Sequence, residues 1–138
     1  MIKILLVLSN LILFVTAQEL LVVADKNFKE DSLTLEEIQG FFLSKKRFVE
    51  GERVLVMNYS FEHPLRQCFE KHILKKSRRN LERYWQKAHY QGRRPPKIVK
   101  SKEMLLSYMQ KVQPSLGYLD SNLTRDIELK ILYRGTCE

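Results

Sequence analysis

Two apolar segments of strand length flank an amphipathic helix pattern, and this order constrains the fold more than any other feature. Leu20–Ala24 is a continuous apolar run, and Arg53–Asn58 is apolar between polar ends. Both patterns are typical of buried strands. Between them, Thr34 and Glu37 have the spacing of a helix-capping box, and an apolar helix face follows: Leu35, Ile38, Phe41 and Phe42. The pattern predicts a βαβ unit with two parallel strands and a right-handed crossover.

The rest of the chain predicts three more helices and two short strands. One helix begins at Pro64, and the others begin after the candidate N-cap residues Ser77 and Ser101. The expected inner faces are Leu65, Phe69 and Ile73; then Leu81, Tyr84, Trp85 and Ala88; then Leu105, Tyr108, Met109 and Val112. We interpret Tyr84 and Trp85 as core residues rather than as a ligand-stacking platform. Strands are expected at 116–119 and 129–133.

The first seventeen residues have the pattern of a secretory signal peptide. A basic start precedes the apolar run from Ile4 to Val15, and small residues follow up to Ala17. The run is shorter than the about 20 residues that span a bilayer. We expect cleavage after Ala17 and one exported domain over residues 18–138, with no transmembrane span after cleavage. An uncleaved anchor is the alternative.

The segment after Arg53–Asn58 predicts a helix start that favours anions. Because proline occupies the first helical position, the amides of the next residues, Leu65, Arg66 and Gln67, are expected to point outward. Arg66 adds a cation at the same helix start. A second start at Ser101 offers a hydroxyl and the cation of Lys102. The candidate anion-binding residues are Ser60, His63, Leu65, Arg66, Ser101 and Lys102. Ordinary helix capping is the alternative at both starts.

Several segments in a fixed order also carry a family resemblance: Leu33-Thr34-Leu35-Glu36-Glu37-Ile38, Phe41-Phe42-Leu43, His63-Pro64-Leu65-Arg66 with Phe69, Tyr84-Trp85, Gly92, Pro95-Pro96 and Leu116-Gly117-Tyr118-Leu119-Asp120. This order resembles the bacterial phosphate ABC transporter substrate-binding proteins, and more closely their short, single-lobe relatives. It covers roughly Leu20 to Asp120. The resemblance implies one α/β lobe of a type II periplasmic-binding-protein-like fold, with a mixed sheet flanked by helices. It also implies phosphate or a similar small anion as ligand, a membrane transporter or sensor as partner, and the periplasm as location.

The chain departs from this family at one position. Where the family usually carries serine or Ser-Gly-Thr beside the anion, this sequence has Glu62-His63-Pro64. A neutral imidazole still donates one hydrogen bond, whereas Glu62 would repel phosphate if it faced the same site. The alternative function is therefore a non-catalytic envelope interaction module that has kept the lobe, lost the ligand and docks through a basic patch.

Positive charge is concentrated in one third of the chain. The formal net charge is +8 at pH 7, and the basic residues cluster with Glu82 as the one acidic residue among them: Lys75, Lys76, Arg78, Arg79, Arg83, Lys87, Arg93, Arg94, Lys97, Lys100 and Lys102. Such a patch attracts phosphate, anionic lipid or an acidic partner without selecting among them. Nucleic acid is not expected, because an exported protein rarely meets it and no exposed aromatics alternate with the basic residues.

Two cysteines remain after the expected cleavage, Cys68 and Cys137. An oxidising compartment favours a disulfide between them. The alternative is a metal site from Cys68, His72 and His63, for which no clear fourth ligand is present. The sequence has no nucleophile elbow or glycine-rich phosphate loop, so neither an enzyme nor a cofactor is expected.

Overall fold

The computed structural model describes residues 18–121 and 127–138. The expected signal peptide, residues 1–17, lies outside the described residues. Within the part of the chain that is described, no helix is both long and apolar enough to cross a membrane.

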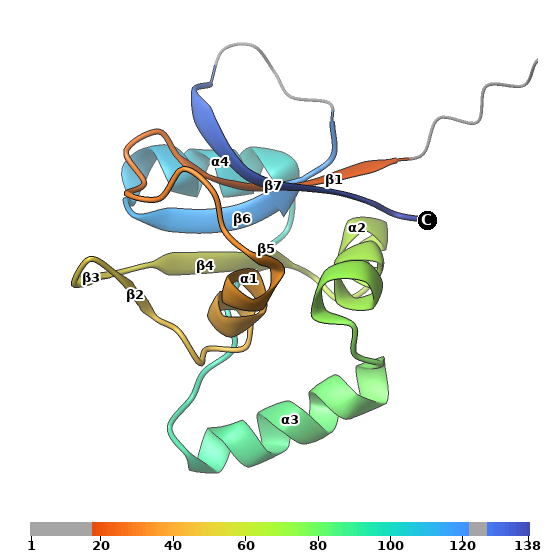
Figure 1. Ribbon diagram of the computed structural model, residues 1–138. Helices are drawn as coiled ribbons and strands as arrows, with labels where there is room; N and C mark the ends of the chain where they lie inside the picture. Colours follow the sequence, from red (N-terminus) through yellow and green to blue (C-terminus); the bar gives the residue numbers. More distant parts are fainter. Residues whose placement is uncertain (1–17, 122–126) are drawn as a thin grey trace, which may run out of the picture.

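A mixed sheet forms the centre of the domain (Figure 1). Within the described residues it has five strands in the order β5-β4-β6-β1-β7. β4 is parallel to both β5 and β6, whereas β1 is antiparallel to β6 and β7. The strands are β1 (Glu19–Asp25), β4 (Leu55–Tyr59), β5 (Lys97–Val99), β6 (Ser115–Leu119) and β7 (Leu129–Thr136). The expected mixed sheet of an α/β lobe is therefore confirmed.

The prediction of a parallel βαβ unit at the start of the chain is wrong. β1 and β4 run in opposite directions, with β6 between them. A short hairpin of β2 (Phe48–Val49) and β3 (Glu52–Arg53) precedes β4 and turns at Glu50 and Gly51, which both have positive φ. This hairpin reverses the chain just before β4 and so sets the direction of that strand.

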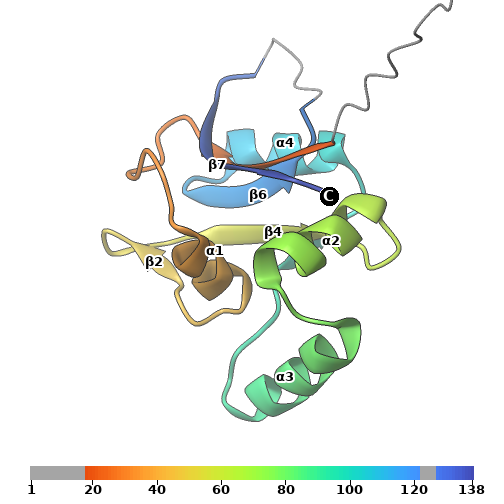
Figure 2. The same ribbon diagram turned by 45° about the vertical axis from the view of Figure 1, so that its right-hand side comes forward.

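The helices begin at the positions that were predicted from their capping residues. They are α1 (Leu35–Phe42), α2 (Pro64–Phe69), α3 (Arg78–Tyr90) and α4 (Lys102–Lys111), and α2 continues into a π-helical turn, η1 (Glu70–Leu74). Thr34 forms the predicted capping box with Glu37, and the hydroxyls of Ser77 and Ser101 each accept a hydrogen bond from a first-turn amide. α1 and α2 cover one face of the sheet and α4 the other, while α3 stands away from it (Figures 1 and 2).

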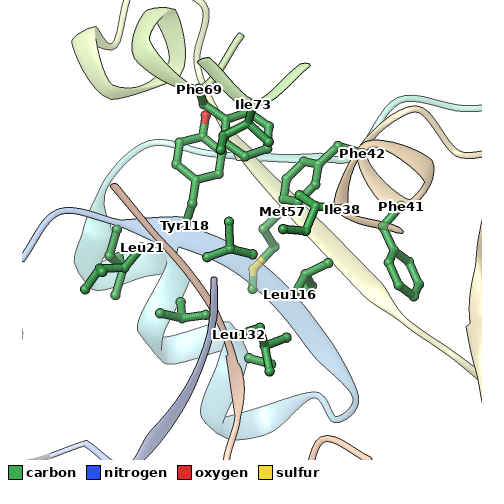
Figure 3. Close-up of a cluster of buried hydrophobic side chains, with 14 of the residues drawn as sticks. Leu21, Ile38, Phe41, Phe42, Met57, Phe69, Ile73, Leu116, Tyr118 and Leu132 are labelled. Atoms are coloured by element: carbon green, nitrogen blue, oxygen red, sulfur yellow. The ribbon is translucent and has the colours of Figure 1, made fainter. Parts of the chain in front are cut away.

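Aromatic side chains fill the core between the sheet and the α1–α2 layer (Figure 3). The ring of Tyr118 stacks on that of Phe69, with centroids 4.0 Å apart, and Phe42 lies 4.5 Å from Phe69. Burial of such rings is the main source of stability in a domain of this size. The expected inner helix faces are largely confirmed, with Tyr84 and Trp85 packed at the margin of the core. Val112, expected to be buried, is 41% exposed because α4 ends before it.

Gly117 and Gly40 provide a stability test with opposite expected signs. A Cβ on Gly117 would lie 2.8 Å from Cδ1 of the fully buried Leu105, so Gly117→Ala should destabilise the fold by about 1–3 kcal/mol through overpacking. Gly40 lies within α1, where a Cβ meets only an ordinary contact at 3.5 Å. Gly40→Ala should therefore stabilise by about 0.5–1 kcal/mol. Urea denaturation measures both, and a stabilising Gly117→Ala would contradict the packing described.

Candidate anion-binding site

The parallel strands bring the two predicted helix starts to the same edge of the sheet. β4 and β5 are parallel neighbours, with Tyr59 opposite Val99, and β6 is parallel to β4 on its other side. α2 follows β4 and α4 follows β5, so both helices begin at the carboxyl ends of these strands. In α/β proteins this edge, where helices leave toward opposite faces, is the usual place for a ligand. We call it the carboxyl edge; the six candidate residues come from its two helix starts.

Hydrogen bonds within the chain already use the amides at the start of α2. Nδ1 of His63 accepts from the amide of Leu65 at 3.1 Å, and the His63 carbonyl accepts from the amides of Arg66 and Gln67 at 3.0 and 3.3 Å. The expectation that these amides point outward is wrong, because His63 is itself the N-cap of α2. A ring that accepts at Nδ1 carries its proton on Nε2, which remains as its donor.

Carboxylates of the chain pair with both candidate cations. Nε of Arg66 lies 3.3 Å from Oε2 of Glu70, and its Nη1 donates to the carbonyl of Tyr59 at 3.0 Å. Nζ of Lys102 lies 3.1 Å from Oδ1 of Asp120, which follows β6. An incoming anion therefore competes with carboxylates already in contact with these cations.

The second helix start is also capped from within. Oγ of Ser101 accepts from the amide of Met104 at 3.1 Å, which leaves the hydroxyl proton as a donor. At the first start, the Ser60 carbonyl accepts from the amide of His63, and this bond closes the turn before α2. The carboxyl edge thus offers side-chain donors more than free backbone amides.

The pKa of the Tyr59 hydroxyl reflects the electrostatic environment of the carboxyl edge. Burial raises the pKa of this hydroxyl, and the carboxylates of Asp120 and Glu103 raise the pKa further. The neutral hydroxyl donates to the carbonyl of Tyr118 at 3.0 Å, and the Tyr59 ring stacks on His63 at 4.3 Å. Asp120 and Glu103 therefore make the potential near the edge less favourable to anions than the helix starts alone suggest.

Sequence reasoning missed the residues that neutralise the site. Glu70 is 6% exposed and bridges two arginines, with Oε1 2.7 Å from Nη2 of Arg78 and Oε2 facing Arg66. The i, i+4 spacing of Arg66 and Glu70 in one helix was the signal that could have revealed this pair. No local pattern indicates that Arg78, on another helix, reaches the same carboxylate.

The predicted disulfide between Cys68 and Cys137 is confirmed, with their Cα atoms 5.3 Å apart. It joins α2 to the segment after β7. The alternative of a metal site loses its thiolate ligand, and the described residues contain no cluster of three or more histidine, cysteine or acidic side chains suited to a metal.

Comparison with known proteins identifies the fold at the level of solved structures. No protein-family profile and no curated protein sequence matches the chain. Among solved structures, the chain is similar to substrate-binding proteins of phosphate ABC transporters. A putative phosphate ABC transporter substrate-binding protein from Clostridium perfringens, solved with bound phosphate, aligns over 84% of this chain with a TM-score of 0.65 and 16% identity.

Two further structures agree. An ABC-type phosphate transport receptor from Vibrio cholerae aligns over 81% of the chain (TM-score 0.63, 13% identity), and PstS from Borrelia burgdorferi aligns over 77% (TM-score 0.59, 14% identity). The chain spans less than half of each, 45%, 45% and 43% of their lengths. It therefore has the fold of about half of a phosphate transporter binding protein, which confirms the resemblance at the level of fold.

Proposed function

We propose that the chain is an exported, non-catalytic, solute-binding-like lobe that binds phosphate or a related anion at the carboxyl edge, in phosphate transport or sensing. One observation carries this proposal: two helix starts converge at the carboxyl ends of β4 and β5, in a fold shared with a phosphate-bound protein. In this function Nε2 of His63 and the hydroxyl of Ser101 donate to the anion. Arg66 and Lys102 supply positive charge.

Binding by the isolated lobe should be weak. A single lobe forms one wall of a site, and Glu70 and Asp120 compete for the same cations. Helix-end effects contribute about 0.3–1 kcal/mol each at exposed sites, whereas millimolar binding requires about 4 kcal/mol and micromolar binding about 8 kcal/mol. We therefore expect a dissociation constant in the millimolar range, which a partner covering the edge would lower.

The test is a titration of the purified protein, first with phosphate and then with sulfate. Binding is monitored through the amide chemical shifts in NMR spectra. Asp120→Asn removes a competing carboxylate and should tighten binding about threefold to fivefold, within the range for a partly exposed ion pair. Lys102→Gln should weaken it by a similar factor. Lys87→Gln, on the exposed surface of α3, is the matched control and should leave affinity unchanged. Unchanged affinity in both edge variants would refute the site.

A second function is favoured by the self-capped start of α2 and by the internal pairing of both candidate cations. In it, the lobe binds no free solute and acts as an envelope interaction module that docks on a membrane transporter, a sensor or another acidic partner through its basic patch. The same titration separates the two functions, because this one predicts no saturable shifts with phosphate in a folded sample.

Location in the periplasm belongs to both proposals. A disulfide-bonded domain with a binding-protein-like fold is compatible with export, since disulfides persist in oxidising compartments. Removal of residues 1–17 during export would give a protein beginning at Gln18, and intact-mass measurement of periplasmic material tests this cleavage.

A further inference from the structure

A cleft of about 1040 Å³ lies between the α2–η1 helix and the start of α3. We call it the η1 cleft, and its lining includes Phe61, Lys71, His72, Lys75 and Arg78. None of the six candidate anion-binding residues lines it. The cleft is open to solvent rather than enclosed, and its surface is more apolar than polar. It is therefore a second recessed surface, separate in its residues from the carboxyl edge.

An exposed aromatic ring held by an ion-paired arginine lines this cleft. Phe61 is 48% exposed, and the guanidinium carbon of Arg78 lies 3.6 Å from the centroid of its ring. Arg78 is fixed in turn by Glu70, at 2.7 Å. Phenylalanine and arginine are both enriched in protein interfaces, and side chains that are already ordered lose little entropy on binding. The Phe61–Arg78 pair has these properties.

The rim of the cleft is positively charged. Lys71, Lys75 and Lys76 are exposed lining residues and outnumber the one exposed lining carboxylate, that of Glu62. The charge of Glu70 is matched by its two arginines. The π-helical turn that carries Lys71 is followed by its C-cap residue Lys75, which adopts the left-handed conformation with φ of 54°. Such turns and non-glycine left-handed residues are costly, and both recur at functional sites.

The openness and charge of the cleft indicate its occupant. A small ligand usually has most of its surface buried, which an open cleft does not provide. A longer segment can cover the cleft, with an apolar side chain on Phe61 and carboxylates against the lysines. We propose that the η1 cleft docks an acidic segment of a partner protein around one apolar anchor residue. This inference rests on the second proposed function and is independent of phosphate binding.

The test is fluorescence anisotropy of the purified protein with a labelled glutamate peptide that has one central phenylalanine. Binding should saturate and weaken as salt rises. Lys71→Glu/Lys75→Glu should reduce affinity roughly tenfold or more, and Phe61→Ala roughly fivefold. An all-glutamate peptide should bind more weakly and be insensitive to Phe61→Ala. The matched control is Arg79→Glu/Arg83→Glu, the same charge change on exposed residues of α3 outside the cleft lining, which should alter affinity less than threefold.

The outcomes distinguish a failure of the η1-cleft proposal from a failure of the interaction-module function on which it rests. Equal losses in the two charge-reversal variants would overturn the cleft assignment but retain an interaction module with a diffuse basic surface. Binding of neither peptide at low salt would overturn both. Binding of phosphatidylglycerol vesicles but of neither peptide would overturn the proposal in favour of a membrane surface. Far-ultraviolet circular dichroism and the urea midpoint of each variant verify that it is folded, and Phe61→Ala, a change at an exposed ring, keeps the test available if a charge reversal unfolds.

Discussion

Loss of the Cys68–Cys137 disulfide is expected to lower the free energy of unfolding by about 4 kcal/mol. The bond closes a loop between cysteines 69 positions apart, and its removal restores the entropy that this closure takes from the unfolded chain. It also ties the segment after β7, an edge strand of the sheet, to α2. Urea denaturation of Cys68→Ala/Cys137→Ala against the oxidised protein measures the difference.

The alanine double variant also serves as the control for the reductant. Its urea midpoint should not move when reductant is added, whereas that of the unaltered protein should fall toward the midpoint of the variant. A loss below about 1 kcal/mol would show that the unfolded chain is compact enough to make this closure nearly free of entropic cost.

Replacement of Glu70 by glutamine is expected to have the second largest effect, a loss of about 2–3 kcal/mol. Glu70 is buried against Arg66 and Arg78, and removal of its charge leaves two guanidinium groups without their carboxylate. Breaking a fully buried pair costs about 3–5 kcal/mol. The expected loss is smaller here because the arginine side chains are 17% and 31% exposed, and water replaces part of the interaction.

Glu82→Gln is the matched control for this substitution. Glu82 is exposed on α3, so the same chemical change there should alter stability by less than about 0.5 kcal/mol. Comparable urea midpoints for the two variants would mean that the Arg66–Glu70–Arg78 cluster contributes little net stability, as happens when desolvation offsets attraction.

Local patterns in the sequence were sufficient for much of the fold. The apolar run of β1, the capping box before α1 and the inner faces of the helices depend on residues close together in the chain, so spacing alone specifies them. The disulfide was predictable for another reason: with only Cys68 and Cys137 after the expected cleavage, one pairing is possible.

The direction of β4 was not predictable from the same patterns. β2 and β3 are two residues each, too short to show the alternation that identifies a strand, and β3 is continuous in sequence with the approach to β4. The reversal between them therefore left no pattern in the sequence. The π-helical turn was hidden in a similar way, because Phe69 and Ile73 keep the spacing of an ordinary helix.

At the candidate site, the sequence identified the two helix starts but not the groups of the chain that hydrogen-bond to their amides and pair with their cations. Nδ1 of His63 accepts from the amide of Leu65, which leaves only Nε2 to donate to a ligand; this arrangement depends on one side-chain rotation, which composition does not determine. Likewise, Asp120 reaches Lys102 only because β6 and β5 end at the same edge of the sheet. Long-range partners of this kind decide how strongly the edge attracts anions, so they decide between the two proposed functions.

The strand order also determines when the domain can fold during synthesis. β1, the first strand of the sheet, lies between β6 and β7, and Leu21 pairs with both Leu119 and Arg134. Contacts so distant in sequence slow folding, since long loops must close before any of these pairings forms. β1 is therefore synthesised early but has no strand to pair with until residues 115–136 have emerged. The nascent chain cannot complete its sheet during that whole interval.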